Sequence, residues 1–164
     1  MCAFSNFSNP FQSELPSNGR HLWQNKHPDR LRHEIFAMRE RFNDSFRLTM
    51  GDDGSLAWDG FLTTNRGNTY RVGLIYPNEF PYEVLSAYVL SPRFPSQHMD
   101  REGKLCLMMR DDNVWQTITT AVAIVALTAA WLFAYETHEE RCRDGSYGAP
   151  CRIGSCPYWP GKKF

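Results

Sequence analysis

The sequence has no excess of charge of either sign, because 18 Lys and Arg residues balance 18 Asp and Glu residues in a chain of 164. There is therefore no broad electrostatic field to attract nucleic acid or an anionic membrane, and we expect no direct contact with either. The N-terminal residues lack the basic stretch and apolar core of a secretory signal, so the expected compartment is the cytoplasm. There, the five cysteines are expected to be free, metal-bound or catalytic, because structural disulfides are rare in that compartment.

A hydrophobic run long enough to cross a membrane is also missing. The most apolar segment, residues 121–135, is shorter than the roughly 20 residues that a bilayer requires, so it predicts a largely buried helix. No phosphate-binding loop of the Gly-x4-Gly-Lys-Ser/Thr type occurs either. The chain is therefore not expected to consume ATP unaided.

The pattern between residues 27 and 42 predicts an amphipathic helix that begins near Pro28. Its apolar side is formed by Leu31, Ile35, Met38 and Phe42. The remaining positions, expected to face solvent, include Arg32, Glu34, Arg39 and Glu40.

Short runs rich in aromatic and β-branched residues then predict four strands of an antiparallel meander. They cover residues 46–50, 56–64, 69–76 and 86–90. An irregular loop follows, and a second, long helix is expected from Trp115 to Tyr135. Strands flanked by helices in this order indicate an α+β fold with two layers.

The predicted organisation has three parts. Residues 1–26 are expected to form an irregular arm, because they are rich in Ser, Asn, Pro and Gly. Residues 27–140 form the domain, and residues 141–164 form a cysteine-containing tail packed on it.

The short stretch "GKLCLM" places Cys106 between two leucines. Free cysteine often serves as a small apolar residue in a core, and that is one interpretation. The other is a nucleophile at a surface, because Cys106 lies in a loop between a meander and a helix and follows Gly103. Lys104 would share a side with the sulfur in an extended stretch, where its charge favours the thiolate.

Three motifs resemble the ubiquitin-conjugating enzyme family, over about residues 27–137. "YPNEFPYEVLSAYVL" (76–90) is similar to the family's segment of prolines and aromatics that joins the third strand to the fourth. "HMDREGKLCL" (98–107) resembles its histidine, turn glycine and active-site cysteine. "DDNVWQTITTAVAIV" (111–125) resembles the polar loop and tryptophan that precede the next helix. The resemblance implies the family's fold: an N-terminal helix, a four-stranded meander, an active-site loop and a long crossover helix.

Two departures distinguish this chain from most eukaryotic members. His98, Met99 and Asp100 stand where the family has His-Pro-Asn, and the interval to the cysteine is about two residues shorter. The paired C-terminal helices are replaced by a short tail. These features resemble the divergent prokaryotic branch, one group of which serves cyclic-oligonucleotide antiphage signalling by modifying a nucleotidyltransferase related to cGAS.

The resemblance implies a cysteine-dependent acyl transferase, which carries a protein C-terminus as a thioester on Cys106 and needs no cofactor. His98 would orient the loop or serve as a structural turn residue. Asp100 replaces the family's asparagine and, when ionised, cannot donate to an oxyanion. It is therefore either a loop-ordering residue or a base for the acceptor, and Asn113 is another source of a donor.

Asp111 and Asp112 border the site, where a carboxylate would help to deprotonate an attacking lysine; a solvated loop is the alternative. The implied partners are an activating enzyme or an adenylated protein, together with a ubiquitin-like protein or a cGAS-like nucleotidyltransferase. Two other functions stay open. One is a catalytically inactive binding module on the same fold, and the other is a thiol protease that would use His98.

A separate pattern lies in the tail. His138 and Cys142 are four residues apart at the end of the second helix, and Cys151 and Cys156 follow. Four such ligands suffice for a closed tetrahedral zinc site. Reduced, packed cysteines are the alternative.

Overall fold

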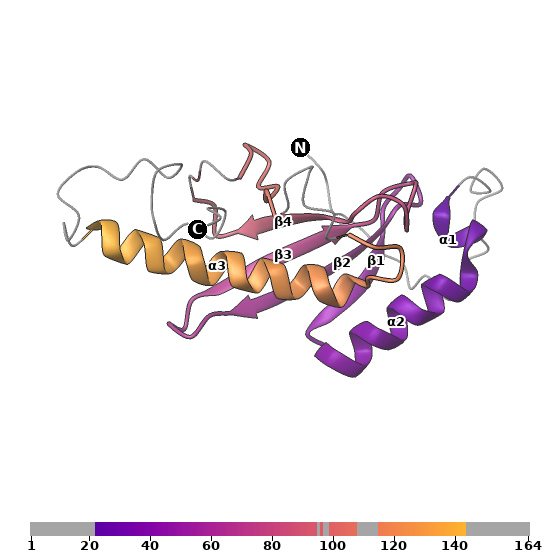
Figure 1. Ribbon diagram of the computed structural model, residues 1–164, viewed down its shortest axis with the longest axis horizontal. Coiled ribbons are helices and arrows are strands. Elements are labelled where there is room, and N and C mark those ends of the chain that lie inside the picture. Colours follow the sequence, from indigo (N-terminus) through magenta and orange to yellow (C-terminus); the bar gives the residue numbers. More distant parts are fainter. Residues whose placement is uncertain (1–21, 95, 97–98, 108–114, 144–164) are drawn as a thin grey trace.

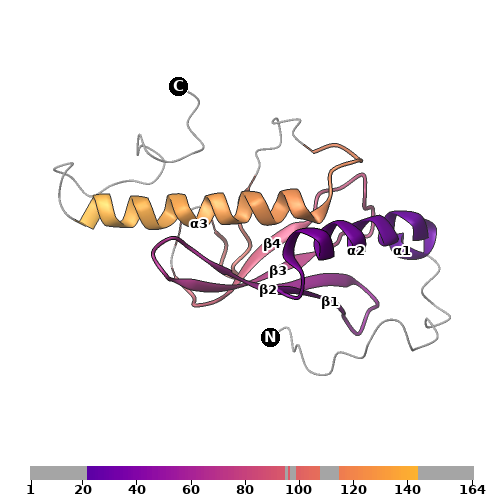
Figure 2. The same cartoon turned by 90° about the horizontal axis from the view of Figure 1, so that it is seen from below.

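The computed structural model describes residues 22–94, 96, 99–107 and 115–143, with residues 138–143 described through their backbone alone. The elements in this part of the chain are α1 (Trp23–Lys26), α2 (Pro28–Phe42), β1 (Phe46–Met50), β2 (Leu56–Thr63), β3 (Thr69–Ile75), β4 (Ser86–Ser91) and α3 (Ala121–Arg143). The strands form one antiparallel sheet in the order β1-β2-β3-β4. Both long helices lie on the same side of it (Figures 1 and 2), which confirms the predicted two-layer α+β fold.

The strands alternate between a face that packs on the helices and an outer face. The inward side chains of the three longest strands are buried, and they include Leu56, Trp58, Tyr70, Val72, Leu74, Ala87 and Val89. The observed strands agree with the predicted ones to within a residue or so, because the turns 51–55 and 64–68 contain the glycines that such hairpins require.

Helix α2 begins at Pro28, as predicted, because proline has no N–H to leave unpaired in the first turn. Its inward side differs from the prediction. Glu34, expected to face solvent, has 0% of its surface exposed, and it lies one turn from the buried Met38. The prediction that Glu34 faces solvent is therefore wrong. The reason is that Glu34 has buried hydrogen-bond partners, which are described with the candidate site.

The last residues of the expected irregular arm are part of the folded body. Trp23 begins the short helix α1 and is 2% exposed. Its ring lies 4.7 Å from that of Tyr76 and 4.6 Å from that of Phe80. Gln24 donates a hydrogen bond to the carbonyl oxygen of Gly54, in the β1–β2 turn. The burial of an aromatic ring thus orders a segment whose composition alone favours irregular structure.

Helix α3 starts later than the sequence predicts. Residues 115–120 form a turn in which the Thr119 N–H donates to the Gln116 carbonyl oxygen at 2.8 Å, and the helix begins at Ala121. Three threonines between residues 117 and 120 favour this, because β-branched and hydroxyl side chains are weak helix formers. At its other end the helix continues past Tyr135 to Arg143 (Figure 1).

The turn between β2 and β3 is fastened to the far half of α3 by one carboxylate. Glu136 is buried, and its Oε1 atom accepts hydrogen bonds at 2.9 Å from the side chains of Thr64, Asn68 and Tyr70. Burial, together with this carboxylate, raises the pKa of Tyr70 far above its ordinary value, so the hydroxyl keeps its proton and donates. Three hydrogen bonds to one side chain therefore link this end of the sheet to α3.

Candidate active site around Cys106

A tight turn precedes the candidate nucleophile. The Asp100 N–H donates to the Lys104 carbonyl oxygen at 2.9 Å, and the Gly103 N–H donates to the Asp100 carbonyl oxygen at 3.1 Å. The Asp100 side chain closes the same turn, because its Oδ1 atom accepts from the N–H groups of Glu102 at 2.9 Å and Lys104 at 2.8 Å. A short acidic side chain that accepts backbone N–H groups in this way stabilises a turn.

Gly103 allows this turn to lie against β4. Its φ angle is +92°, a conformation that residues other than glycine rarely adopt. A Cβ atom at this position would lie 2.4 Å from the carbonyl oxygen of Val89. The Val89 N–H donates to the Gly103 carbonyl oxygen, and the Leu105 N–H donates to the Ala87 carbonyl oxygen, both at 2.8 Å. The turn is thus hydrogen-bonded to the edge of the sheet.

This pairing decides where the sulfur of Cys106 lies. Leu105 is 5% exposed and belongs to the core, whereas its neighbours Lys104 and Cys106 are exposed. The thiol of Cys106 is free and exposed. Of the two interpretations of this cysteine, the structure is compatible with a surface nucleophile and not with a core residue.

The chain is anchored on both sides of this segment. Upstream, Phe94 stacks on Tyr135 of α3 at 4.2 Å between ring centroids and contacts Tyr70 of β3 at 5.8 Å. Downstream, the indole N–H of Trp115 donates to the carbonyl oxygen of Pro81 at 2.8 Å. Both the entry to the segment and the exit from it are therefore tied to the body of the domain.

Several predicted site residues lie outside the described part of the chain. They are His98, Asp111, Asp112 and Asn113, and in the tail Cys151 and Cys156. His138 and Cys142 belong to α3, but the structure describes only their backbone. Within the described residues, no three His, Cys, Asp or Glu side chains lie close enough to share a metal ion.

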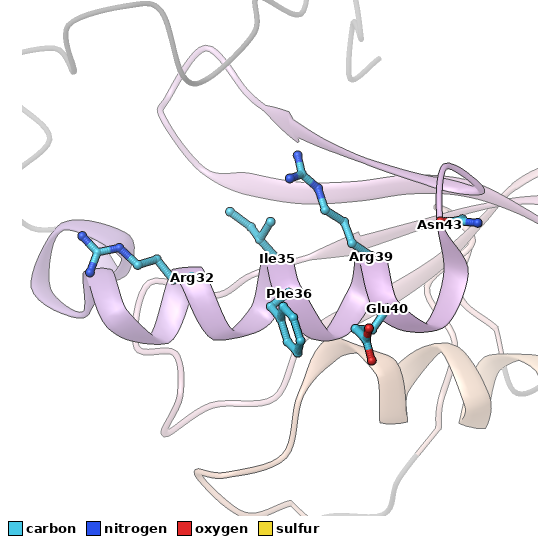
Figure 3. A pocket seen from close by; sticks show the side chains of 6 residues that line it. All are labelled: Arg32, Ile35, Phe36, Arg39, Glu40 and Asn43. Atoms are coloured by element: carbon cyan, nitrogen blue, oxygen red, sulfur yellow. The ribbon is translucent and has the colours of Figure 1, made fainter.

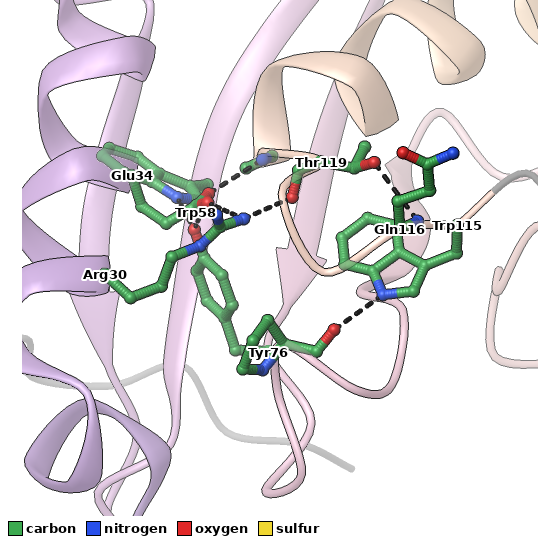
Figure 4. Close-up of polar contacts among 9 residues, drawn as sticks. Arg30, Glu34, Trp58, Tyr76, Trp115, Gln116 and Thr119 are labelled. Carbon is green, nitrogen blue, oxygen red and sulfur yellow. Dashed lines mark hydrogen bonds and ion pairs between the residues drawn. The ribbon is translucent and has the colours of Figure 1, made fainter.

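A buried polar cluster near the exit of the segment was missed by sequence reasoning. The Glu34 Oε2 atom accepts hydrogen bonds from the Tyr76 hydroxyl and from the Ala121 backbone N–H, each at 2.8 Å (Figure 4). Tyr76 in turn accepts from the indole N–H of Trp58 at 2.9 Å. The one available signal was the i,i+4 spacing of Arg30 and Glu34, which form an ion pair at 2.9 Å.

The titration of this cluster follows from its burial. Loss of solvent is the largest effect on Glu34 and raises its pKa, although the bonds from Ala121 and Tyr76 and the charge of Arg30 oppose that shift. Burial and the Glu34 charge also raise the pKa of Tyr76 well above its ordinary value. The tyrosine hydroxyl is therefore a donor at any physiological pH.

A shallow groove lies on α2, separate from the thiol segment. It is lined by Arg32, Ile35, Phe36, Arg39, Glu40 and Asn43 (Figure 3). Phe36 is 63% exposed, so the groove presents an aromatic ring together with two arginines and one glutamate. None of these residues belongs to the segment that holds Cys106.

No helix among the described residues combines the length and apolar character needed to cross a membrane.

The fold resembles that of a solved ubiquitin-conjugating enzyme. Human ubiquitin-conjugating enzyme E2 G1 matches with a TM-score of 0.50 and 16% sequence identity, over 64% of this chain and 93% of that chain. At this identity the similarity defines the class of fold: a ubiquitin-conjugating-enzyme-like domain.

A family model described as "Type II CBASS E2 protein" matches residues 34–142. Because this span is more than half of the chain, the chain belongs to the type II CBASS E2 family. No match was found among curated proteins.

Proposed function

We propose that this chain carries the C-terminal carboxyl group of a protein as a thioester on Cys106 and passes it to a lysine or another nucleophile of a partner. The observation that carries the proposal is the exposed thiol that follows a turn hydrogen-bonded to β4, in a fold of the ubiquitin-conjugating class. Membership of the type II CBASS E2 family supports a role in antiphage defence. The protein modified there would be a cGAS-like nucleotidyltransferase.

The reaction has two steps. An activating enzyme supplies the acyl group as an adenylate, the Cys106 thiolate attacks its carbonyl carbon, and AMP leaves as the bond to the phosphate oxygen breaks. A partner amine then attacks the thioester carbonyl. The carbon–sulfur bond breaks, the amine loses a proton to a base, and the thiolate is regenerated.

The neighbouring residues have different roles in this proposal. Asp100 orders the turn, because Oδ1 already accepts two backbone N–H groups. His98 is proposed to orient the same loop. Asp111 and Asp112 are the proposed bases for the acceptor amine.

The test is reconstitution with the activating enzyme, ATP and the nucleotidyltransferase, followed by electrophoresis without reductant. We expect an adduct that neutral hydroxylamine cleaves, as it does a thioester, and that Cys106→Ala does not form. Cys106→Ser should form an oxyester that withstands hydroxylamine. An adduct of the same kind on Cys106→Ala would refute the proposal, and binding without any adduct would favour an inactive binding module.

The tail cysteines provide matched controls for this experiment. Cys142, Cys151 and Cys156, each replaced by Ser, should leave loading of Cys106 intact if they are reduced, packed residues. If they hold a structural zinc ion with His138, each substitution should instead lower both the zinc content and the stability. Metal analysis of protein purified without chelator separates the two cases, since less than one zinc per chain excludes the site.

A further inference from the structure

The buried pair formed by Arg30 and Glu34 holds the chain at the point where it enters α3. Glu34 has no exposed surface, and its Oε2 atom accepts the Ala121 N–H, in the first turn of that helix. A carboxylate at this place also interacts favourably with the positive end of the helix dipole. Glu34 thus acts on α3 from a different helix, α2.

Arg30 fastens the residues just before. Its guanidinium donates to the carbonyl oxygen of Thr119 (Figure 4). It also lies over the ring of Phe80, 5.2 Å from the centroid. Its side chain is 16% exposed. One member of the pair therefore donates to the backbone of residues 119–121, and the other accepts from it.

The tethered residues continue the segment that leaves Cys106. Trp115, nine positions after Cys106, donates to the Pro81 carbonyl oxygen, and its ring lies 6.0 Å from that of Phe80. Phe80 thus contacts both Trp115 and Arg30. Residues 115–121 are fixed at one end by Trp115 and at the other by the Arg30–Glu34 pair.

Stability alone is a weak explanation for this arrangement. Burial of two charges costs several kcal/mol, and apolar side chains of similar volume often replace such a pair without loss of stability. The pair does, however, fix the positions of two backbone groups, the Thr119 carbonyl and the Ala121 N–H. Together with the bond from Trp115 to Pro81, these contacts fix residues 115–121, which follow Cys106 in the chain.

We propose that Arg30 and Glu34 are positioning residues for the reaction at Cys106. They act through residues 115–121, and they touch neither the sulfur nor the substrate. The effect on acyl transfer rests on the proposed thioester chemistry. The effect on the reactivity of the Cys106 thiol does not, and it is measured first. Releasing the tether should change the reactivity of the exposed thiol toward a small reagent and disturb the alignment of a large acceptor.

The main test uses the apolar double variant Arg30→Met/Glu34→Leu, which removes both tethers and leaves no unpaired charge. The rate of Cys106 alkylation by iodoacetamide is followed by mass spectrometry of the peptide that contains it. We expect the alkylation rate to change by at least about threefold and the Ala121 amide hydrogen to exchange roughly tenfold faster, as for one lost hydrogen bond. The urea midpoint should fall, because the buried Tyr76 hydroxyl and Ala121 N–H lose their acceptor, but the variant should stay folded without denaturant. Transfer from the preloaded thioester to the amine should fall by about threefold or more.

A matched control exists on the sheet. Asp59 and Arg71 form an ion pair with two hydrogen bonds, at 3.0 and 2.6 Å, between β2 and β3. The variant Arg71→Met/Asp59→Leu also removes one Arg–carboxylate pair. It should leave alkylation, transfer and exchange of the Ala121 amide at the parental values.

A milder variant keeps the test decisive if the apolar one does not fold. Arg30→Met/Glu34→Gln keeps an acceptor for Ala121 and loses only the tether to Thr119, so it should shift both rates in the same directions by a smaller factor. Parental alkylation and transfer rates in either folded variant would overturn the proposal. If the parent itself forms no thioester, the proposed function fails, while alkylation and amide exchange still decide the positioning role.

Discussion

The Cα atom of Gly103 faces the backbone of Val89 so closely that a methyl group on the glycine would lie 2.4 Å from the Val89 carbonyl oxygen. Gly103→Ala should therefore combine an unfavourable φ with a clash against backbone that cannot move cheaply. We expect a loss of about 3 kcal/mol in the free energy of unfolding, or a local detachment of the turn from β4. Urea unfolding and loading of Cys106 would both report it.

Gly67 separates the two effects in that prediction. It has a similar φ of +83°, but an added Cβ atom would meet nothing within 4 Å. Gly67→Ala should cost only the conformational strain, about 1–2 kcal/mol, and leave loading unchanged. An equal loss of free energy of unfolding at the two positions would mean that the short distance between Gly103 and Val89 does not restrict the residue at position 103.

Asp100 offers a test between a turn-forming role and a base. Asp100→Asn keeps an Oδ1 acceptor for the N–H groups of Glu102 and Lys104, and Asp100→Ala removes it. Loading should stay within about twofold for the asparagine variant and fall by about tenfold for the alanine variant, as expected for the loss of one or two net hydrogen bonds. If transfer to the acceptor fails equally in both, the carboxylate is acting as a base.

Trp23 should be a large contributor to stability although it lies near the end of the expected arm. It is 2% exposed, and its indole N–H has no hydrogen-bond partner in the described part of the protein, so its contribution is packing against Tyr76 and Phe80. Trp23→Ala should lower the free energy of unfolding by about 3–5 kcal/mol, measured by urea titration. Phe36→Ala, on the exposed side of α2, should change it by about 0.5 kcal/mol or less.

The raised pKa of Glu34 predicts an unusual dependence of stability on pH. The folded protein holds this proton more tightly than the unfolded chain, because burial disfavours the ionised form. The contribution of Glu34 to the free energy of unfolding should therefore rise as the pH falls from neutrality through the folded pKa to 4.5, the ordinary value. It should be lost again as the pH is raised.

The measurement is a series of urea titrations of the parent and Glu34→Gln over that pH range. The parent should gain stability relative to the variant on acidification. Glu40→Gln, which removes one negative charge from the exposed side of the same helix, is the control. A parent that loses stability relative to Glu34→Gln on acidification would contradict the direction of the shift.

The sequence predicts the order of elements well, because the strand period, the turn glycines and Pro28 are local signals. It also predicts a turn glycine three residues before an accessible cysteine. It does not predict the burial of Glu34, because a charged residue one turn from Arg30 is usually solvated. Its partners, Tyr76 and the N-terminus of α3, are distant in the sequence and come close to Glu34 only in the folded protein.

The late start of α3 has a similar cause. Hydrophobicity from Trp115 onward suits a helix, but the indole of Trp115 and the carbonyl of Thr119 bond to Pro81 and Arg30, far away in the chain. Those long-range bonds hold residues 115–120 outside the helix. The sequence alone allows Asp100 either to order the turn or to act as a base, and its two bonds to backbone N–H groups give a physical basis for the first role.

The turn of residues 100–103 also has a consequence for how an incoming polypeptide can be received. Gly103 and Leu105 already form hydrogen bonds with the backbone of Val89 and Ala87. An added strand from another protein therefore cannot use these backbone groups of the edge strand β4. In the proposed reaction, a polypeptide delivered to Cys106 would therefore be recognised through contacts other than strand addition at Ala87 and Val89.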